Sequence, residues 1–393
     1  RIYCRTMYIM HKNNVSIIGQ SMEGTIIKNA PDFHNEGIGT TATLLIPKNI
    51  SGTYLQDLTL QNAMDYYGAI AAGLEGGRGV VLQDQGTKTV CKNVRLLSYQ
   101  DTYYSNLGGA VKYFEDCEIH GTVDFICGDG SVYFKNNLLY CEKRNLNGSG
   151  SDALTANNGP ATDKGYVFEG CTVKSECPVV SLGRAWNNSP ACVFLNTTVD
   201  YSAGEFAFAD SKGGIQRWTK VLMSANAWPR FGEYNTRDKE GNLLTPESNV
   251  VTFLDKKGGN ATQNIETVLS AEQAATYTMA YTLGDWAETA ANDAKQVILT
   301  YKDGEWVPTE ATVFLVEEDG VASLVTELPE WKEGIVVRAA NARGGFGKPA
   351  YEAWAESVEN IQDAAPKAFK VFRNGQLVII RDGKEYNALG MEL

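Results

Sequence analysis

The chain has 393 residues, a formal net charge of −12 and 21% charged residues. This length is enough for one large core and for two or three modules. The negative charge argues against nucleic acid or an anionic membrane as a partner, and no apolar run of about 18 residues predicts a membrane span.

The sequence begins at Arg1 with neither an initiator Met nor an apolar leader, and residues 1–9 have the pattern of a strand interior. We therefore expect the chain to start inside a fold, with any secretory signal absent. Eight cysteines all lie in the first half, without a C-x-x-C pair. This pattern argues against a zinc site and favours buried thiols over disulfides.

A short pattern recurs from residue 14 to about residue 201, in which two apolar strands flank one residue of a turn-forming type. These turn residues are Asp57, Asn93, Asp116, Asn136, Gly170 and Asn196. Irregular repeats of roughly 20–35 residues without a helical period indicate a solenoid, and a right-handed parallel β-helix fits best. We expect four cysteines at one position of the repeat to point inward: Cys91, Cys117, Cys141 and Cys171.

The repeat fades after residue 201. Residues 202–262 are rich in loops and aromatic side chains, which we expect to cap the solenoid or to flank its cleft. Ser270 and Gln273 have the spacing of a capping box, and the alanine-rich stretch that continues to about Lys295 predicts one or two helices. We assign residues 1–295 to the β-helix domain.

A different pattern begins at Val297, where strands of period two alternate with Asp-Gly and Gly-Gly turns. We expect a small β-sandwich of the fibronectin or immunoglobulin kind over residues 296–350. Residues 351–393 are expected to form a helix, from Ala350 to about Gln362, and a β-hairpin tail. Its turn is predicted at Asn374-Gly375, with a second turn at Asp382-Gly383.

Two carboxylates interrupt apolar runs in the middle of the solenoid. They are Asp101, in Tyr99-Gln-Asp-Thr-Tyr-Tyr104, and Asp124, in Gly121-Thr-Val-Asp-Phe-Ile-Cys-Gly128. If both segments are strands, alternation makes the neighbours of Asp124 point into the core while its carboxylate points outward. Strands stacked in register would then bring the two acids together for acid/base or nucleophilic chemistry.

Three segments in this order, Tyr99–Thr102, Gly121–Ile126 and Leu182–Trp186, resemble the signature segments of the pectin methylesterases (pectinesterases). The resemblance covers about residues 1–295. It implies a right-handed β-helix that hydrolyses the C6 methyl ester of galacturonate residues in pectin and releases methanol. It also implies that the enzyme needs neither a metal nor an organic cofactor.

The resemblance also implies roles for individual residues. Asp124 would be the nucleophile, and Asp101 the acid that protonates methanol and then activates water. Gln100 would donate to the oxyanion, Arg184 would hold Asp124 ionised, and Trp186 would offer an apolar face to a sugar ring. The aromatic residues Tyr103 and Phe125 also suit contact with carbohydrate.

The sequence departs from the family at several positions. Arg78 stands where the family usually has a second glutamine, 22 residues before Gln100. This guanidinium either supports the oxyanion more strongly or marks a different substrate. Cys127 replaces a common Phe, and Ala185 replaces a common Pro. We expect these changes to affect substrate identity more than the catalytic roles.

Alternatives remain open. The histidines do not form the Gly-His-Gly segment of polygalacturonases, and the acids do not form the calcium cluster of pectate lyases. An esterase or thioesterase of the same fold acting on another ester, and a carbohydrate-binding solenoid without catalysis, both fit the sequence. We expect pectin as the substrate and a monomer. The C-terminal module and tail resemble appendages of secreted bacterial polysaccharide-degrading enzymes, which suggests export to the periplasm or cell surface.

Overall fold

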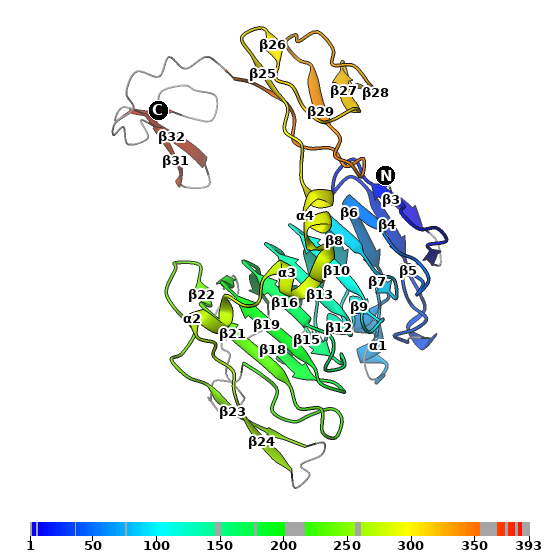
Figure 1. Cartoon of the computed structure of the whole chain (residues 1–393), viewed down its shortest axis with the longest axis vertical. Coiled ribbons are helices and arrows are strands. Elements are labelled where there is room, and N and C mark those ends of the chain that lie inside the picture. Colours follow the sequence, from blue (N-terminus) through cyan, green and yellow to red (C-terminus); the bar gives the residue numbers. More distant parts are fainter. Residues whose placement is uncertain are drawn as a thin grey trace.

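The structure is a computed structural model that describes residues 2–4, 7–35, 37–74, 77–145, 151–176, 179–200, 217–255, 261–353, 368–373, 376–381 and 384–386. Strands dominate it, and the main body is a parallel β-helix (Figure 1). The fold predicted from the sequence repeat is therefore confirmed.

Three ladders of parallel strands run along the solenoid, and the first two share β6 and β8. The first comprises β3 (Ser16–Ile18), β6 (Tyr54–Asn62), β8 (Thr89–Leu97), β10 (Val111–Glu115), β13 (Ser131–Lys135), β16 (Gly165–Glu169), β19 (Ala191–Leu195) and β21 (Arg230–Tyr234). The second adds β1 (Ile2–Cys4), β4 (Ile26–Asn29), β11 (Glu118–Gly121), β14 (Leu138–Cys141), β17 (Thr172–Ser175), β20 (Thr198–Asp200) and β22 (Arg237–Asp238). The third comprises β2 (Tyr8–Ile9), β5 (Leu44–Ile46), β7 (Leu82–Asp84), β9 (Tyr103–Ser105), β12 (Ile126–Gly128), β15 (Ser151–Asn157) and β18 (Val179–Ala185).

The bend between the first and second ladders is made by one residue in the left-handed conformation. The six turn residues predicted from the sequence all have positive φ, between 51° and 63°. Asn, Asp and Gly tolerate this conformation, which other side chains adopt only at a steric cost. Asn235 (φ 55°) repeats the bend one coil further, where the sequence analysis did not place one.

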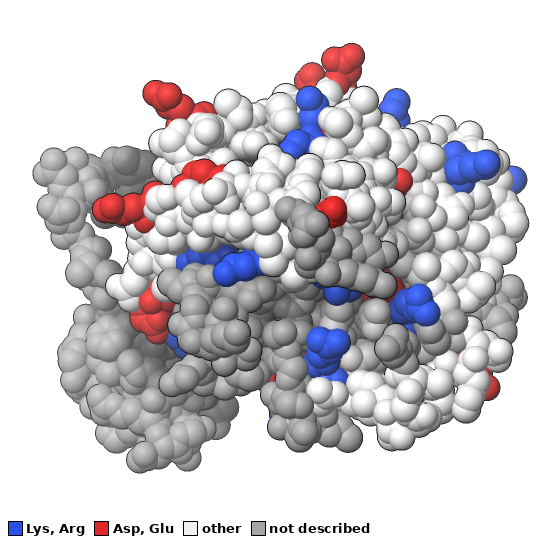
Figure 2. All heavy atoms as spheres, turned by 90° about the horizontal axis from the view of Figure 1, so that it is seen from below, with Lys and Arg blue, Asp and Glu red and all other residues white. Residues whose placement is uncertain are grey.

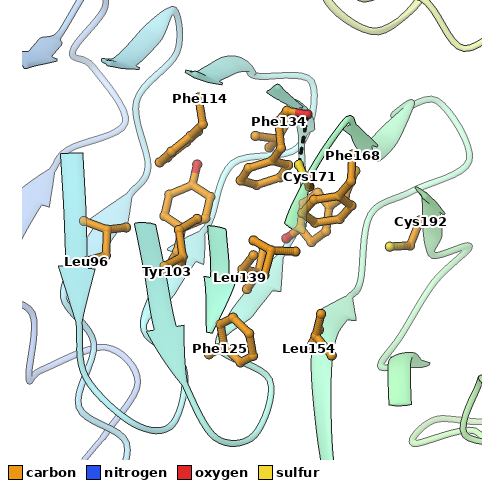
Figure 3. Close-up of a cluster of buried hydrophobic side chains, with 14 of the residues drawn as sticks. Leu96, Tyr103, Phe114, Phe125, Phe134, Leu139, Leu154, Phe168, Cys171 and Cys192 are labelled. Carbon is orange, nitrogen blue, oxygen red and sulfur yellow. Dashed lines mark hydrogen bonds between the residues drawn. The ribbon is translucent and has the colours of Figure 1, made fainter. Parts of the chain in front are cut away.

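The core is built from aligned side chains on successive coils (Figure 3). The rings of Phe134, Phe168 and Phe194 are register partners, and each stacks on the next at 4.4 Å between centroids. The four cysteines predicted to point inward are buried. Six cysteines in the described part of the chain are free thiols. Burial raises the pKa of Cys91, Cys117 and Cys171, as expected for apolar thiols.

Helices cover the outer face of the first ladder (Figure 1). The capping box is present at Ser270, which accepts a hydrogen bond from the Gln273 backbone. The predicted one or two helices are instead three short α-helices, because Thr278 caps a new start and Gly284 ends the second with φ 59°. They are α2 (Ala271–Ala274), α3 (Met279–Leu283) and α4 (Ala287–Ala294), with the 3₁₀ turn η3 (Gly284–Trp286) between the last two.

Three further elements lie outside the ladders and the helical cover. The short helix α1 (Tyr66–Ala71) and the 3₁₀ turn η1 (Phe33–Asn35) were not predicted. An antiparallel pair, β23 (Val250–Leu254) and β24 (Thr262–Glu266), occupies the region expected to be loop-rich.

Between Lys295 and Ala353 the described strands form two three-stranded sheets around a separate core, which contains Phe314, Val316 and Val337. One sheet comprises β25 (Thr300–Lys302), β26 (Glu305–Trp306) and β30 (Tyr351–Ala353), and the other β27 (Phe314–Glu318), β28 (Val321–Val325) and β29 (Val336–Ala339). We call these six strands the C-terminal module. That this module is a β-sandwich of the fibronectin or immunoglobulin kind stays a prediction.

The helix predicted from Ala350 is wrong at its start, because residues 351–353 form β30 and pair with β25. The rest of that prediction, residues 354–362, lies outside the described residues. The tail pairs β31 (Ala368–Arg373), β32 (Gln376–Arg381) and β33 (Lys384–Tyr386) as antiparallel neighbours, which confirms the hairpin. The two predicted turns, residues 374–375 and 382–383, also lie outside the described residues.

Charged side chains are scattered among uncharged ones on the face of the described residues shown in Figure 2. Basic and acidic residues do not gather there into a patch of one sign. None of the helices in the described part of the chain is long and apolar enough to cross a membrane.

Candidate active site

The third ladder presents the chemistry-bearing residues. Tyr104, Cys127, Ala156 and Arg184 are register partners on four successive coils. Since side chains alternate along a strand, this row shares one face of the sheet, and the rows beside it point into the core. The side chain of Arg184, two coils beyond Cys127, therefore reaches the same outer wall.

Asp101 and Asp124 occupy equivalent places one coil apart. Each lies two residues before a strand, and the residues that follow them, Tyr103 and Ile126, are register partners. Both aspartates have positive φ, 59° and 53°. The expectation that they lie within alternating strands is therefore wrong. A left-handed bend before each strand turns the carboxylate out of the core, and aspartate is one of the few residues that adopt it readily.

One pocket of about 190 Å³ contains six of the eight residues predicted for the site. Its lining consists of Ile38, Arg78, Gln100, Asp101, Asp124, Cys127, Arg184, Trp186 and Met223. The acids, the amide and two guanidinium groups thus meet at one place on the outer wall. The proximity predicted from three separate sequence segments is confirmed.

The Asp124 carboxylate is held on one side only. Arg184 Nη2 donates a hydrogen bond to Asp124 Oδ2, whereas Oδ1 is buried and has no hydrogen-bond partner in the part of the chain that the structure describes. Burial raises the pKa of Asp124, and the positive charges of Arg184 and then Arg144 oppose this rise. As predicted, Arg184 lowers the pKa of Asp124. Burial, however, raises that pKa by more than Arg184 lowers it.

Gln100 and Arg78 are neighbours on adjacent coils. A parallel β-bridge joins them, and it confirms that residues 22 apart in the sequence are one coil apart here. The Thr41 hydroxyl donates a hydrogen bond of 2.7 Å to the Arg78 carbonyl and so fixes the backbone. An amide and a guanidinium therefore lie side by side at the edge of the pocket, where both can donate to an oxygen of a substrate.

The aromatic wall differs in part from the predicted one. The rings of Trp186 and Tyr104 lie 6.3 Å apart between centroids, and the Trp186 backbone is fixed by a hydrogen bond to the Asn157 carbonyl. Tyr103 and Phe125 are fully buried. The ring centroids of Tyr103 and Phe114 lie 4.7 Å apart inside the solenoid (Figure 3). The predicted contact of Tyr103 and Phe125 with substrate is wrong. Tyr103 points inward because it alternates with the outward Tyr104, and Phe125, which follows the left-handed bend at Asp124, also lies in the core.

Three pocket residues were not among the predicted site residues: Cys127, which was noted only as a departure from the family, Ile38 and Met223. Ile38 precedes β5 in an irregular segment, and Met223 follows the last coil of the ladder, where its backbone donates to the Ala185 carbonyl. Neither residue belongs to a recognisable motif, so only their three-dimensional position identifies them.

Other motif residues hold the two acid-bearing segments together. Thr102 Oγ1 donates to the His120 carbonyl, and the Thr122 backbone donates to the Tyr99 carbonyl, both at 2.7 Å. A Cβ at Gly121 would lie 2.1 Å from the Phe125 Cβ, so only glycine fits there. These contacts explain the small and hydroxyl-bearing residues around each aspartate. Within the described residues, no group of three or more His, Cys, Asp or Glu side chains is arranged to hold a metal ion.

Comparison with known protein families gives a match over residues 2–224 to the family described as Pectinesterase. Probable pectinesterase/pectinesterase inhibitor 21 of Arabidopsis thaliana is 27% identical over 197 residues, which cover 48% of this chain and 28% of that protein. Probable pectinesterase 56 of the same plant is 27% identical over 198 residues, covering 48% of this chain and 65% of that protein. This chain thus spans less than two thirds of these curated relatives.

Solved structures show the same fold. Pectin methylesterase PemA from Erwinia chrysanthemi has a TM-score of 0.55 and 25% identity, covering 73% of this chain and 86% of that chain. A pectin methylesterase mutant in complex with a hexasaccharide has a TM-score of 0.54, 25% identity and the same coverage. The carrot pectin methylesterase has a TM-score of 0.54 at 18% identity, covering 74% of this chain and 84% of that chain, and supports the fold alone.

Proposed function

Because this chain belongs to the pectinesterase family, we propose that it removes methyl esters from the galacturonate residues of pectin and releases methanol. The observation that carries the proposal is the pocket itself. It brings Asp101, Asp124, Gln100 and Arg184 together beside an aromatic wall, on the outside of a solenoid where an extended polymer has access. The hexasaccharide bound to a structural relative agrees with a chain-like substrate.

In the first half of the reaction, Oδ1 of Asp124 attacks the carbonyl carbon of the ester. The Gln100 amide donates to the oxygen that becomes negative, an interaction of a few kcal/mol in the transition state. The bond to the methoxy oxygen then breaks, Asp101 gives its proton to that oxygen, and methanol leaves. An acyl group remains on Asp124.

In the second half, Asp101 is a carboxylate and takes a proton from water as the water oxygen attacks the acyl carbon. The bond to Asp124 breaks, the nucleophile is restored, and the galacturonate carboxylic acid is released. Arg184 keeps the Asp124 side chain in position throughout, because its Nη2 donates a hydrogen bond to Oδ2, the oxygen that does not attack. Every step uses protein side chains and water.

Substrate contact is assigned to Trp186, Tyr104 and Arg78. The two rings form an apolar wall beside the acids, which suits the C–H face of a sugar. The Arg78 guanidinium lines the same pocket and adds a cation. A second candidate function follows from this cation: an esterase of the same fold that acts on a different ester, including a thioester. Hydrolysis rates measured on a methyl-esterified pectin and on a thioester distinguish the two candidate functions.

The decisive experiment measures methanol release from highly methyl-esterified pectin by the wild type, Asp124→Asn and Asp101→Asn. Asparagine is chosen because it tolerates the positive φ at both positions. We expect each variant to lose activity by roughly three orders of magnitude or more while its circular dichroism and melting temperature are retained.

The matched control is Asp303→Asn, because Asp303 also has a left-handed backbone, at φ 55°, is exposed and does not line the pocket. It should keep wild-type activity. Binding of pectin by the wild type without methanol release would support the non-catalytic solenoid instead.

Two further expectations belong to this proposal. We place the protein outside the cytoplasm, either secreted, in the periplasm or at the cell surface, because its substrate is a polymer of the plant cell wall. We also propose that it acts as a monomer, since the whole pocket comes from one chain. Fractionation of producing cells and light scattering of the purified protein test these points.

A further inference from the structure

A second, larger cavity lies far from the acids in the sequence. Its volume is about 890 Å³, against about 190 Å³ for the catalytic pocket. One wall is the segment 18–21 of the solenoid together with Asp57, and the other is the sheet formed by β27, β28 and β29 of the C-terminal module. Ligand sites are commonly of this size and commonly lie between modules.

The module wall is the face of its sheet that does not belong to its own core. Phe314 and Val316 of β27 point into that core, whereas Leu315 between them lines the cavity. Leu324 of β28 is the register partner of Leu315 and is 66% exposed. An apolar surface is therefore open to any ligand that enters.

The floor of the cavity fixes the two walls relative to each other. The Asn341 amide donates to the Tyr54 hydroxyl at 3.0 Å and to the Asp293 carbonyl at 2.9 Å. The Gln56 amide donates to the Phe346 carbonyl at 3.0 Å. A Cβ at Gly345 would lie 1.7 Å from Gln56 Oε1, so the loop packs directly on the solenoid. The cavity is thus formed before a ligand arrives.

The cavity is lined by two carboxylates, Asp57 and Glu317, and by one guanidinium, Arg338. The Asp57 carboxylate accepts hydrogen bonds from the Gln56 and Asn93 amides. Burial raises the pKa of Asp57, and the positive charges of Arg338 and Lys92 oppose this rise. Such a wall offers hydrogen bonds and apolar surface, and its excess of carboxylates over guanidinium groups disfavours an anionic chain.

A second space of about 370 Å³ shares Asp57 and Arg338 with the cavity as lining residues. In this second space Lys92 pairs with Asp116 at 2.6 Å, and Glu23 pairs with Arg95 at 3.0 Å. We call the two neighbouring spaces together the cleft.

We propose that this cleft, lined by residues 18–21, Asp57, Leu315, Leu324 and Arg338, binds an uncharged glycan chain at a site separate from the catalytic pocket. Sugar rings combine an apolar C–H face with hydroxyl groups, which matches leucine side chains beside amides. A chain without charge also avoids repulsion by the carboxylates of Asp57 and Glu317. A methyl-esterified galacturonan is one such uncharged chain. The site extends the proposed function but does not depend on it.

Isothermal titration calorimetry with full-length Asp124→Asn tests the proposal without turnover. The probes are oligogalacturonides that are fully methyl-esterified or fully de-esterified. Added to this background, Leu324→Asp should weaken binding of the esterified probe about tenfold. Val321→Asp is the matched control, because Val321 lies on the same strand, is 69% exposed and does not line the cleft. It should leave the affinity unchanged.

Methanol release by Leu324→Asp, made in the otherwise wild-type chain, from a short esterified substrate should equal that of the wild type. Equal affinities for Leu324→Asp and Val321→Asp, or tighter binding of the de-esterified probe, would overturn the proposal. So would a dimer that Leu324→Asp dissociates in light scattering, because the exposed face would then be a self-interface. Failure of the proposed function would give a different result: the wild type would release no methanol, but the esterified probe would still bind in the cleft.

Discussion

Arg184 reaches across two coils of the solenoid to hydrogen-bond one oxygen of Asp124, and within the described residues the other oxygen has no hydrogen-bond partner. The carboxylate is therefore oriented without being fully satisfied. This arrangement suits a nucleophile, since the paired oxygen fixes the geometry and the unpaired one carries the lone pair that attacks. It also makes the ionisation of Asp124 depend on a single guanidinium at close range.

Replacement of Arg184 by glutamine should therefore move the acidic limb of the pH profile upward. Asp124 attacks only when ionised, burial raises its pKa, and Arg184 opposes that rise. Without the guanidinium the pKa rises further, so a higher pH is needed for the same ionised fraction. We expect the acidic limb of kcat/KM for methanol release to move to higher pH. Arg184→Lys, which keeps the charge, should shift it less. Identical acidic limbs in the wild type, Arg184→Gln and Arg184→Lys would contradict the proposed role of Arg184 in keeping Asp124 ionised.

Replacement of Arg78 by glutamine should mainly affect the binding of partly de-esterified pectin. The guanidinium lines the pocket beside Gln100 and offers a charge to a free carboxylate of a neighbouring galacturonate. We expect KM to rise about tenfold for pectin with many free carboxylates, which corresponds to about 1.4 kcal/mol, and to change little for fully esterified pectin. A fall in kcat with an unchanged KM on both substrates would instead place Arg78 at the oxyanion.

The fold was predictable because the solenoid repeats its local signals. Each coil needs one residue that tolerates positive φ, and Asn93, Asp116 and Asn136 mark three of these bends in the sequence. Inward cysteines and phenylalanines recur on the same period. The predicted meeting of Asp101 with Asp124 followed from stacking of coils, although the local conformation was wrong. A left-handed bend and a strand both put an isolated aspartate after an apolar run, so the pattern alone does not separate them.

The aromatic residues show where the sequence was insufficient. Tyr103 and Tyr104 are adjacent and identical, and one is in the core while the other lines the outer wall. A shift of one residue in register exchanges their faces. Ile38 and Met223 come from irregular segments without periodicity, so their approach to the pocket depends on long-range packing. The helix α1 is short, and its Asp65 cap became recognisable only from the structure.

Replacement of Asn136 should show how much a residue that tolerates positive φ contributes to the free energy of unfolding. Asn136 has φ 55° between β13 and β14, and its side chain is exposed. Asn136→Ala is expected to lower the free energy of unfolding by about 1–2 kcal/mol, because alanine clashes with the backbone in this conformation. Asn136→Gly should cost clearly less, since glycine adopts it without a clash. Chemical denaturation of the three proteins measures both values, and equal losses for alanine and glycine would argue against backbone strain as the cause.

Replacement of Lys112 by methionine should strongly destabilise the solenoid. Lys112 is fully buried and donates to Ser105 Oγ at 2.7 Å and to the Asp84 carbonyl at 3.0 Å. Burial lowers its pKa and raises that of Asp84, and each charge opposes the shift of the other. Removing the cation leaves the Asp84 carboxylate uncompensated, so we expect a loss of about 3–5 kcal/mol at neutral pH.

The sign of the pH dependence distinguishes this cause from a simple packing defect. Without Lys112 the pKa of Asp84 rises further in the fold, so the folded state binds more protons than the unfolded state above about pH 4. The Lys112→Met variant should therefore lose stability, relative to the wild type, as pH rises through that window, and Lys112→Met with Asp84→Asn should not. Lys135→Met is the control, because Lys135 is 43% exposed and its pair with Glu115 is expected to contribute about 1 kcal/mol or less. Urea denaturation at several pH values measures the difference, and a deficit independent of pH would show that lost packing, not charge, is responsible.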